Sequence, residues 1–288
     1  MTSPEAPPLD PPEVPGLGRM LAILSEGLTA PGGRYFPHPG DLLWWLYHQD
    51  PRLRPLETRV EGDAFAVLSE TDVAVFARPG AARGPLLRRC VARAGSGLEV
   101  GWVSCDDEEA GSLLREMGMG PSPRTEGGAC YTRPVALEEW PTPARFVVRP
   151  LAGEHEAWAR REASHAAFAS TMDPGEHHAR YLRFMRSPAY GRARDLVAVT
   201  PEGRVAAFMV WWPDSHSRIA QLEPVGTHPD YQRRGLGRAL LGAGMRDMAR
   251  SGMTAVRVGT DDDRPGAIAF YKALGLRRTM AFRWWSAR

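Results

Sequence analysis

Apolar and polar residues follow two alternating patterns in the second half of the chain. Apolar residues three and four positions apart predict helices, and short runs rich in β-branched and aromatic residues predict strands. We expect helices over about 153–170, 175–187, 235–250 and 265–274. We expect strands over about 196–200, 204–212, 219–227, 255–260 and 279–285. Strands that alternate with helices indicate an α/β fold, here of the α+β layered kind.

The helix expected at 235–250 has one apolar side. Leu236, Leu240 and Met248 are expected to face a sheet. A second row, which includes Arg238 and Gly242, is expected to face solvent. We therefore expect this helix to cover one face of the sheet.

The first half of the chain repeats the same order in a weaker form. Gly84 and Gly118 stand in surroundings similar to those of Gly235 and Gly275, at a nearly constant separation. We interpret the halves as tandem copies of one domain. Each copy is expected to be a mixed, mostly antiparallel sheet flanked by helices.

Proline-rich segments mark the expected domain boundaries. Residues 1–16 hold six prolines and almost no large apolar side chains, which predicts a disordered tail. The segment Trp-Pro-Thr-Pro at 140–143 indicates a linker. The predicted domains are therefore 17–143 and 144–288.

Composition and charge narrow the function classes. The net charge is +2 without an arginine-rich block, so no nucleic-acid partner is expected. The apolar run 205–212 is far shorter than the roughly 20 residues that span a membrane, and no signal peptide is recognised. Three widely spaced cysteines form neither a disulfide framework nor a metal signature, so no metal is expected. We expect a cytoplasmic protein, monomeric or homodimeric.

The strand at 219–227 carries an irregularity. Pro224 cannot donate a hydrogen bond within a sheet and Gly226 weakens a strand interior, so a bulge is expected around Val225. A bulge leaves backbone groups unpaired. The backbone from Val225 through Gly226 to Thr227 is therefore a candidate binding edge for the amides of an extended ligand.

The turn after this strand opens a helix with the features of an anion site. The first N–H groups of a helix lack internal partners and lie at the positive end of its dipole, a geometry that binds phosphate or diphosphate. Two glycines allow close approach to the backbone, and arginines add charge. The candidate residues are Gln232, Arg233, Arg234, Gly235, Leu236, Gly237 and Arg238. The spacing matches neither a P-loop nor the Rossmann fingerprint.

At this point the chain resembles the GNAT acyltransferase superfamily, over about 145–288. The matching residues are Gln232, Gly235, Gly237, Ala267, Tyr271, Gly275 and Leu276. The last four lie in the helix 265–274 or directly after it. Two departures from the usual pattern are Arg264 in place of asparagine and Leu276 in place of phenylalanine.

The resemblance implies acetyl-CoA, or a close acyl-CoA, as co-substrate and direct transfer to the amine of a small molecule. It implies that Tyr271 protonates the departing thiolate, and it assigns Arg264 and Phe270 to the acyl-CoA site. In the first half only Gly84 survives from this motif, and Leu114 stands where Tyr271 stands. We infer that the first half is a degenerate copy that does not catalyse.

Direct attack by an amine requires a base. An alkylamine is free base in only about one molecule in 2,500 at pH 7. Glu223 shares a strand face with Val225, and we take it as the candidate base, acting directly or through a water. A structural carboxylate paired with an arginine is the alternative reading, and His228 is a rival base. A backbone N–H near Val225 is expected to hold the oxyanion.

Two other functions remain open from the sequence. One is a catalytically silent acyl-CoA-binding scaffold, and the other is a protein N-acetyltransferase. The tryptophan pairs 211–212 and 284–285 are candidates for an acceptor pocket, although such pairs are more often core residues. Adjacent helical residues do not share a face, so His177 and His178 are expected to be solvated.

Overall fold

The computed structural model describes residues 13–30, 37–48, 57–94, 97–123 and 127–287. Positions 1–12 of the expected proline-rich tail lie outside the described residues, and α1 begins at Leu17. Within the described ranges no helix has the length and apolarity needed to cross a bilayer.

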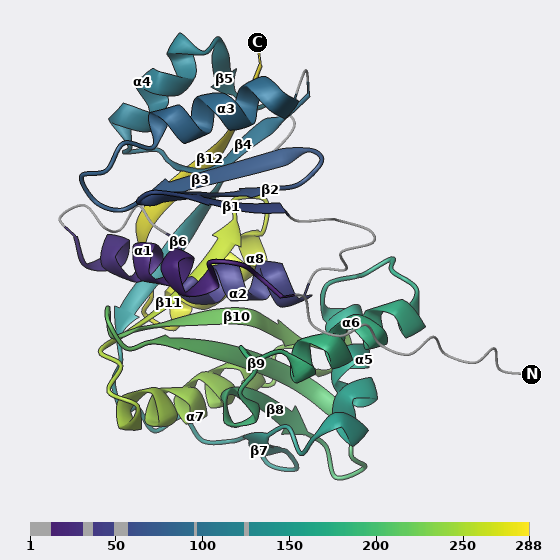
Figure 1. Ribbon diagram of the computed structural model, residues 1–288. Coiled ribbons are helices and arrows are strands. Elements are labelled where there is room, and N and C mark those ends of the chain that lie inside the picture. Colours follow the sequence, from purple (N-terminus) through teal and green to yellow (C-terminus); the bar gives the residue numbers. More distant parts are fainter. Residues whose placement is uncertain (1–12, 31–36, 49–56, 95–96, 124–126, 288) are drawn as a thin grey trace, which may run out of the picture.

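The two halves share a succession of two helices, three strands, a helix, a strand, a helix and a final strand (Figure 1). The first half comprises α1 (Leu17–Thr29), α2 (Pro39–His48), β1 (Glu57–Glu61), β2 (Ala64–Leu68), β3 (Asp72–Ala77), α3 (Gly84–Ala94), β4 (Glu99–Ser104), α4 (Glu108–Glu116), β5 (Met119–Pro121) and β6 (Gly128–Pro134). The second half comprises β7 (Val147–Pro150), α5 (Ala157–Ala167), α6 (Pro174–Arg186), β8 (Asp195–Val199), β9 (Val205–Asp214), β10 (Ile219–Thr227), α7 (Leu236–Arg250), β11 (Ala255–Asp261), α8 (Pro265–Ala273) and β12 (Arg277–Ala287). Strand β7 precedes the shared succession only in the second half, and β5 is inserted only in the first. The α/β class and the tandem repetition are confirmed.

All the strands of the described chain join one mixed sheet. Its order is β1-β2-β3-β4-β12-β6-β11-β10-β9-β8-β7, with β5 paired to β12 off this path. Strand β6 belongs to the first half in sequence but lies between β11 and β12 of the second half. Strand β12 pairs in turn with β4 of the first half. The halves therefore exchange strands, while the boundary at 143/144 stays a proposal for the chain's domain division.

Each half contains one parallel strand pair that separates after a few residues. In the first half, β3 and β4 pair only at Asp72–Glu99 and Val73–Val100. In the second half, β10 and β11 pair from Ile219 to Leu222 and then part. A cavity of about 350 Å³ follows the separation in the first half. The corresponding separation in the second half holds the candidate site.

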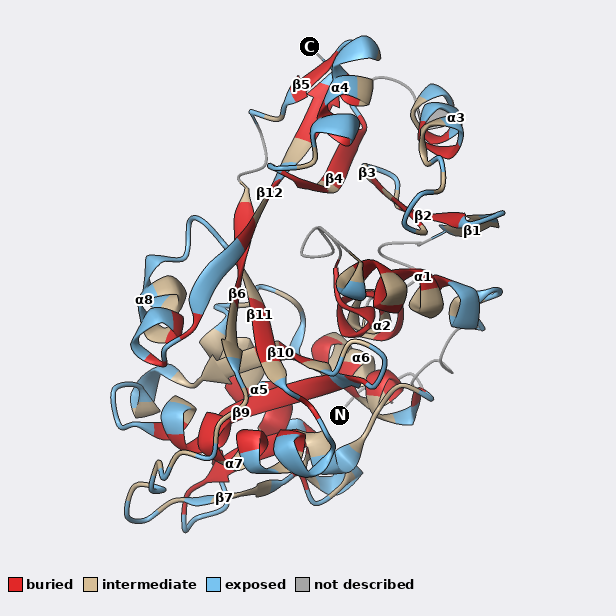
Figure 2. Cartoon of the chain, turned by 90° about the vertical axis from the view of Figure 1, so that its left-hand side faces the viewer, coloured by how far each residue is buried: buried red, intermediate tan, exposed pale blue. Residues whose placement is uncertain are grey.

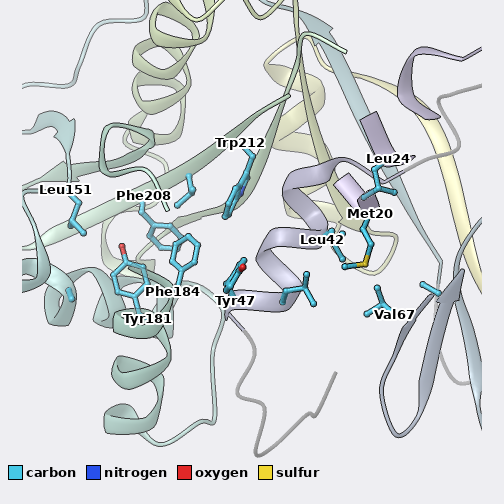
Figure 3. Close-up of a cluster of buried hydrophobic side chains, with 14 of the residues drawn as sticks. Met20, Leu24, Leu42, Tyr47, Val67, Leu151, Tyr181, Phe184, Phe208 and Trp212 are labelled. Carbon is cyan, nitrogen blue, oxygen red and sulfur yellow. The ribbon is translucent and has the colours of Figure 1, made fainter. Parts of the chain in front are cut away.

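Helices cover both faces of the second half's sheet. Helices α7 and α8 pack on the face that carries Leu222 and Val258. On the opposite face, α2 of the first half packs beside α5 and α6, where Trp212 and Phe208 of β9 are buried (Figure 3). Figure 2 shows α8 on one side of β6, β10 and β11 and α2 on the other. The first half thus supplies part of the cover over β10.

Two expectations about exposure are wrong. Gly242 is buried rather than solvent-facing, because Trp140 of the expected linker packs on it. His177 is only 7% exposed, because α6 turns it toward α5, where its Nδ1 lies 3.3 Å from Nδ1 of His165. His178 is half-buried, with its ring edge-on to Trp158. The irregular segment 140–143 is confirmed as a connection without helix or strand.

A buried ion pair fixes α5 and α6 to the sheet. Asp195 at the start of β8 is 0% exposed, and its Oδ1 lies 3.3 Å from Nε of Arg160, which is 1% exposed. The Tyr181 hydroxyl donates to Oδ2 of the same carboxylate, and Tyr190 donates to it at 3.3 Å. Burial raises the pKa of both tyrosines, so they remain donors.

Candidate active site

The bulge in β10 lies where the sequence predicts it. Leu222 pairs with Trp211 of β9, and the next paired residue, Val225, meets Met209. Strand β10 therefore uses one residue more than β9 over this interval. The bulge coincides with the end of the pairing with β11, so no strand of the described residues pairs with the edge from Glu223 to Thr227 on that side. An extended ligand has room to pair with it.

Helix α7 begins directly beyond this edge. Gly235 precedes the helix with φ +81°, a left-handed conformation that favours glycine. The first backbone hydrogen bond of the helix runs from the N–H of Ala239 to the carbonyl of Gly235. The amides of residues 236–238 therefore precede the regular hydrogen-bonding pattern and suit an anion. These amides could therefore bind the negatively charged diphosphate of an acyl-CoA.

Three arginines surround the start of α7, and all are exposed: Arg233, Arg234 and Arg238. Arg234 donates to the carbonyl of Asp230 at 2.9 Å and lies over the Tyr231 ring. Arg238 lies over Trp140. Gln232 is exposed and reaches the carbonyl of Thr227 only at 3.4 Å. Exposed cations next to helix amides favour a phosphorylated ligand.

The structure gives Gly237 a different role from the expected one. A Cβ at Gly237 would lie 2.6 Å from Cζ of Phe270 on α8. The missing side chain thus allows α8 to pack against α7 rather than only opening space for an anion. Phe270 is half-buried at this contact, whereas Arg264 at the start of α8 is exposed and lies within 4.0 Å of Asp261 and Asp263.

Glu223 lies in the bulge, and only a small part of it is exposed. Burial raises the pKa of this carboxyl well above its ordinary value, and the neighbouring charge of Asp41 raises it further, while Arg257 opposes the shift. The Glu223 carbonyl accepts a hydrogen bond from Nε1 of Trp212 at 2.7 Å. A carboxyl with a raised pKa beside an unpaired strand edge has the properties of a general base.

His228, the rival base, has a structural role in the turn that follows β10. Its Nδ1 accepts from the backbone N–H of Asp230 at 3.2 Å and caps the short helix Pro229–Tyr231. The ring therefore stabilises the approach to the α7 loop. Glu223 remains the better-placed candidate base.

Tyr271 lies on α8, on the sheet face opposite α2. It is 7% exposed, and its ring centroid is 6.4 Å from that of Tyr131 on β6. Burial, with a smaller effect from the charge of Glu223, raises its pKa to about 12. Its hydroxyl therefore keeps a proton at neutral pH, as a general acid must.

Four polar residues near Glu223 were missed by the sequence reasoning. They are His38 directly before α2, Asp41 of α2, Cys130 of β6 and Arg257 of β11, and all are at most 4% exposed. Nη2 of Arg257 lies 3.0 Å from Sγ of Cys130. One signal was visible: Arg257 is a single charge inside an apolar strand. Asp41 carried no such signal, since its proximity to β10 depends on how the halves pack.

Three of the four paired tryptophans are core residues, and Trp284 is half-buried. Trp211 and Trp212 are buried on opposite faces of β9, and Trp285 is buried in the first half's core. No group of three or more His, Cys, Asp or Glu side chains suited to a metal occurs in the parts of the chain that the structure describes.

The loop before α3, which corresponds to the candidate anion loop before α7, lacks the features that suit an anion. Arg83 precedes α3 and forms a two-pronged ion pair with Asp107, with both N···O distances 2.6 Å. Pro85 removes an amide from the first turn of α3. These features favour the interpretation of a degenerate copy, although the cavity between β3 and β4 is retained.

Comparison with known proteins agrees with this geometry. The model of the acetyltransferase (GNAT) family matches residues 161–276. The mycothiol acetyltransferase of Pseudarthrobacter chlorophenolicus is 29% identical over 184 residues, which cover 62% of this chain and 56% of the relative. That of Paenarthrobacter aurescens is 27% identical over 224 residues, covering 75% of this chain and 68% of the relative. The chain thus spans little more than half the length of the first of these relatives.

Solved structures share the fold over nearly the whole chain. A tandem GNAT protein from the clavulanic acid biosynthesis pathway aligns with a TM-score of 0.67 at 17% identity, covering 97% of this chain and 96% of that one. A GCN5-related N-acetyltransferase from Sphaerobacter thermophilus aligns with a TM-score of 0.57 at 17% identity, covering 96% and 93%. Residues 161–276 of this chain thus form a GNAT acetyltransferase domain, and the chain as a whole has the fold of a tandem GNAT protein.

Proposed function

We propose that the chain is an N-acetyltransferase that moves an acetyl or related acyl group from acetyl-CoA to a primary amine of a small molecule. The observation that carries this proposal is the arrangement around the β10 bulge. An unpaired strand edge, the start of α7 and a buried carboxyl with a raised pKa lie in succession. The named relatives support a small-molecule acceptor, since they are mycothiol acetyltransferases.

The edge and the α7 loop would bind the co-substrate. Backbone groups of Val225, Gly226 and Thr227 pair with the amides of its extended arm. The amides at the start of α7 and Arg233 and Arg234 bind its diphosphate. This places the thioester near the bulge, with an N–H near Val225 available for the oxyanion.

The reaction is a single acyl transfer. The amine nitrogen attacks the thioester carbonyl carbon, a C–N bond forms, and the C–S bond breaks. Glu223 accepts the proton that the nitrogen loses, directly or through a water. Tyr271 gives its proton to the departing sulfur. We assign no catalytic step to the first half in this scheme.

A combined binding and turnover experiment tests the function. Calorimetry measures CoA binding, and thiol release is followed with a panel of small amines that includes the acceptor of mycothiol acetyltransferases. Turnover with at least one amine supports the proposal. Binding without turnover supports the scaffold alternative, and acetylation of a peptide amine alone supports the protein N-acetyltransferase. Absence of CoA binding overturns all three.

Replacement of Tyr271 by phenylalanine is expected to lower kcat by about 10- to 100-fold, because the thiolate then leaves without a positioned acid. The dissociation constant for CoA should change less than about threefold, since the ring and its packing are kept. Steady-state kinetics and calorimetry check this pair of values. Unchanged kcat would remove Tyr271 as the acid, and Tyr131→Phe serves as a matched control in the same core.

A further inference from the structure

Helix α2 of the first half is attached directly to the strand that carries Glu223. Nε2 of His38 lies 3.0 Å from the carbonyl oxygen of Ile219, and Nδ1 accepts from the N–H of Gly40 at 2.9 Å. His38 is therefore the neutral tautomer that donates from Nε2, consistent with a pKa that burial lowers to about 4. A Cβ at Gly40 would lie 2.4 Å from Cβ of Trp212, so the backbone of α2 touches β9.

This attachment brings Asp41 to Glu223 and leaves it with an unmet hydrogen bond. Asp41 is 1% exposed, and its Oδ2 accepts from the backbone N–H of His38 at 2.7 Å. Among the described residues no donor forms a hydrogen bond to its Oδ1. Leaving a buried carboxylate oxygen without a donor is costly. A proton on Glu223 supplies that donor.

The charges around the two acids favour a single shared proton. The charged groups that act on Glu223 are Asp41 of α2 and Arg257 and Asp261 of β11. The charge of Glu223 acts in turn on Cys130 of β6 and Tyr271 of α8. His38 is neutral, and Cys130 and Tyr271 have raised pKa values, so they carry no charge at pH 7. Arg257 is the buried cation of this group, and it balances one carboxylate rather than two.

We propose that Asp41 is a positioning residue for Glu223: the two carboxyl groups share one proton, so the first half sets both the orientation and the protonation of the second half's base. This proposal rests on the proposed function, because it assigns Glu223 as the base. In the resting enzyme the proton lies on Glu223 and is hydrogen-bonded to Asp41. When an ammonium group enters, the shared proton passes to bulk solvent and the ammonium charge takes its place beside the two carboxylates, so that Glu223 is free to accept a proton from the amine. The half with the degenerate motif thus carries out no catalytic step itself but supplies a positioning residue to the site.

The variant Asp41→Asn tests the proposal, because asparagine keeps an acceptor for the His38 N–H and removes the charge. We expect the acid limb of the kcat profile to move to lower pH by about one unit or more, since a neighbouring negative charge no longer favours protonation of Glu223. The profile is measured with saturating, weakly basic amine, so that substrate ionisation lies outside the range. Asp41→Glu should restore the wild-type limb, and Asp63→Asn, an exposed residue of the first half, should leave it unchanged.

Infrared difference spectroscopy gives a readout that does not depend on turnover. The wild-type protein at neutral pH should show the C=O band of one protonated carboxyl, which Glu223→Gln removes. Absence of that band overturns the shared proton, whether or not Asp41→Asn folds. An unchanged acid limb in Asp41→Asn, with Glu223→Gln inactive, overturns the role of Asp41 alone. Full activity of Glu223→Gln would instead overturn the assigned base.

Discussion

Replacement of Glu223 by glutamine is expected to reduce kcat by about 10²- to 10⁴-fold, the usual contribution of a general base. Glutamine keeps the shape of the side chain but cannot accept the proton of the attacking amine. The backbone carbonyl of Glu223, which accepts from Trp212, is unaffected by the change. Assays of thiol release give kcat. Calorimetry should show a dissociation constant for CoA within about threefold of the wild-type value.

The pH dependence of kcat in the wild-type enzyme gives a second test of Glu223 as the base. Burial raises the pKa of Glu223, and Asp41 adds to the shift. A base acts when deprotonated, so kcat should fall as the pH drops through this raised pKa, above the range where an ordinary glutamate titrates. In Glu223→Gln this limb should disappear. A limb that persists unchanged would show that another group is the base, and Glu202→Gln, an exposed glutamate on the β8–β9 turn, is the matched control.

Local features of the site were predictable because each depends on a few adjacent residues. Pro224 and Gly226 predicted the bulge, since one cannot pair in a sheet and the other weakens it. Gly252 and Gly275 follow α7 and α8 with φ +78° and +80°, as helix-ending glycines should. The second half's strands and helices agree with the expected ranges to within a few residues at their ends, except β7, which was not expected.

Features that depend on distant contacts were not predictable. The position of β6 between β11 and β12 arises from pairing between residues more than a hundred positions apart, such as Cys130 and Gly259. Hydrophobic periodicity specifies which face of a strand is buried but not which strand lies beside it. The burial of Gly242 by Trp140 has the same origin, because a linker has no periodicity to indicate where it packs.

The candidate base, Glu223, combines a local feature that was predictable with a distant contact that was not. The position of Glu223 on the bulged strand follows from its sequence neighbours. Its electrostatic environment comes from Asp41, which precedes it by almost two hundred positions, and from Arg257 on another strand. The sequence therefore indicated a candidate base, whereas the structure was needed to identify the residues whose charges shift its pKa. The degenerate motif of the first half gave no indication that this half reaches the site.

The second large effect concerns stability, at the carboxylate that joins α5 and α6 to β8. Asp195→Ala is expected to lower the free energy of unfolding by about 3–5 kcal/mol, because Arg160 becomes a buried charge without its partner. The hydroxyls of Tyr181 and Tyr190 lose their acceptor as well. Urea unfolding followed by circular dichroism measures the change. Asp247→Ala, which removes a surface partner of Arg250 on α7, should cost less than about 1 kcal/mol.

The double variant Arg160→Met/Asp195→Leu separates the loss of the pair from the loss of its parts. Much of the cost of Asp195→Ala comes from an uncompensated guanidinium stacked on Phe208, with 3.7 Å between Cζ and the ring centroid. Removing both charges eliminates that cost, so the double variant should be more stable than Asp195→Ala despite its second substitution. If the two are equally unstable, the tyrosine hydrogen bonds rather than the charge pair anchor α5 and α6 to the sheet. If Asp195→Ala is as stable as Asp247→Ala, the pair does not anchor these helices at all.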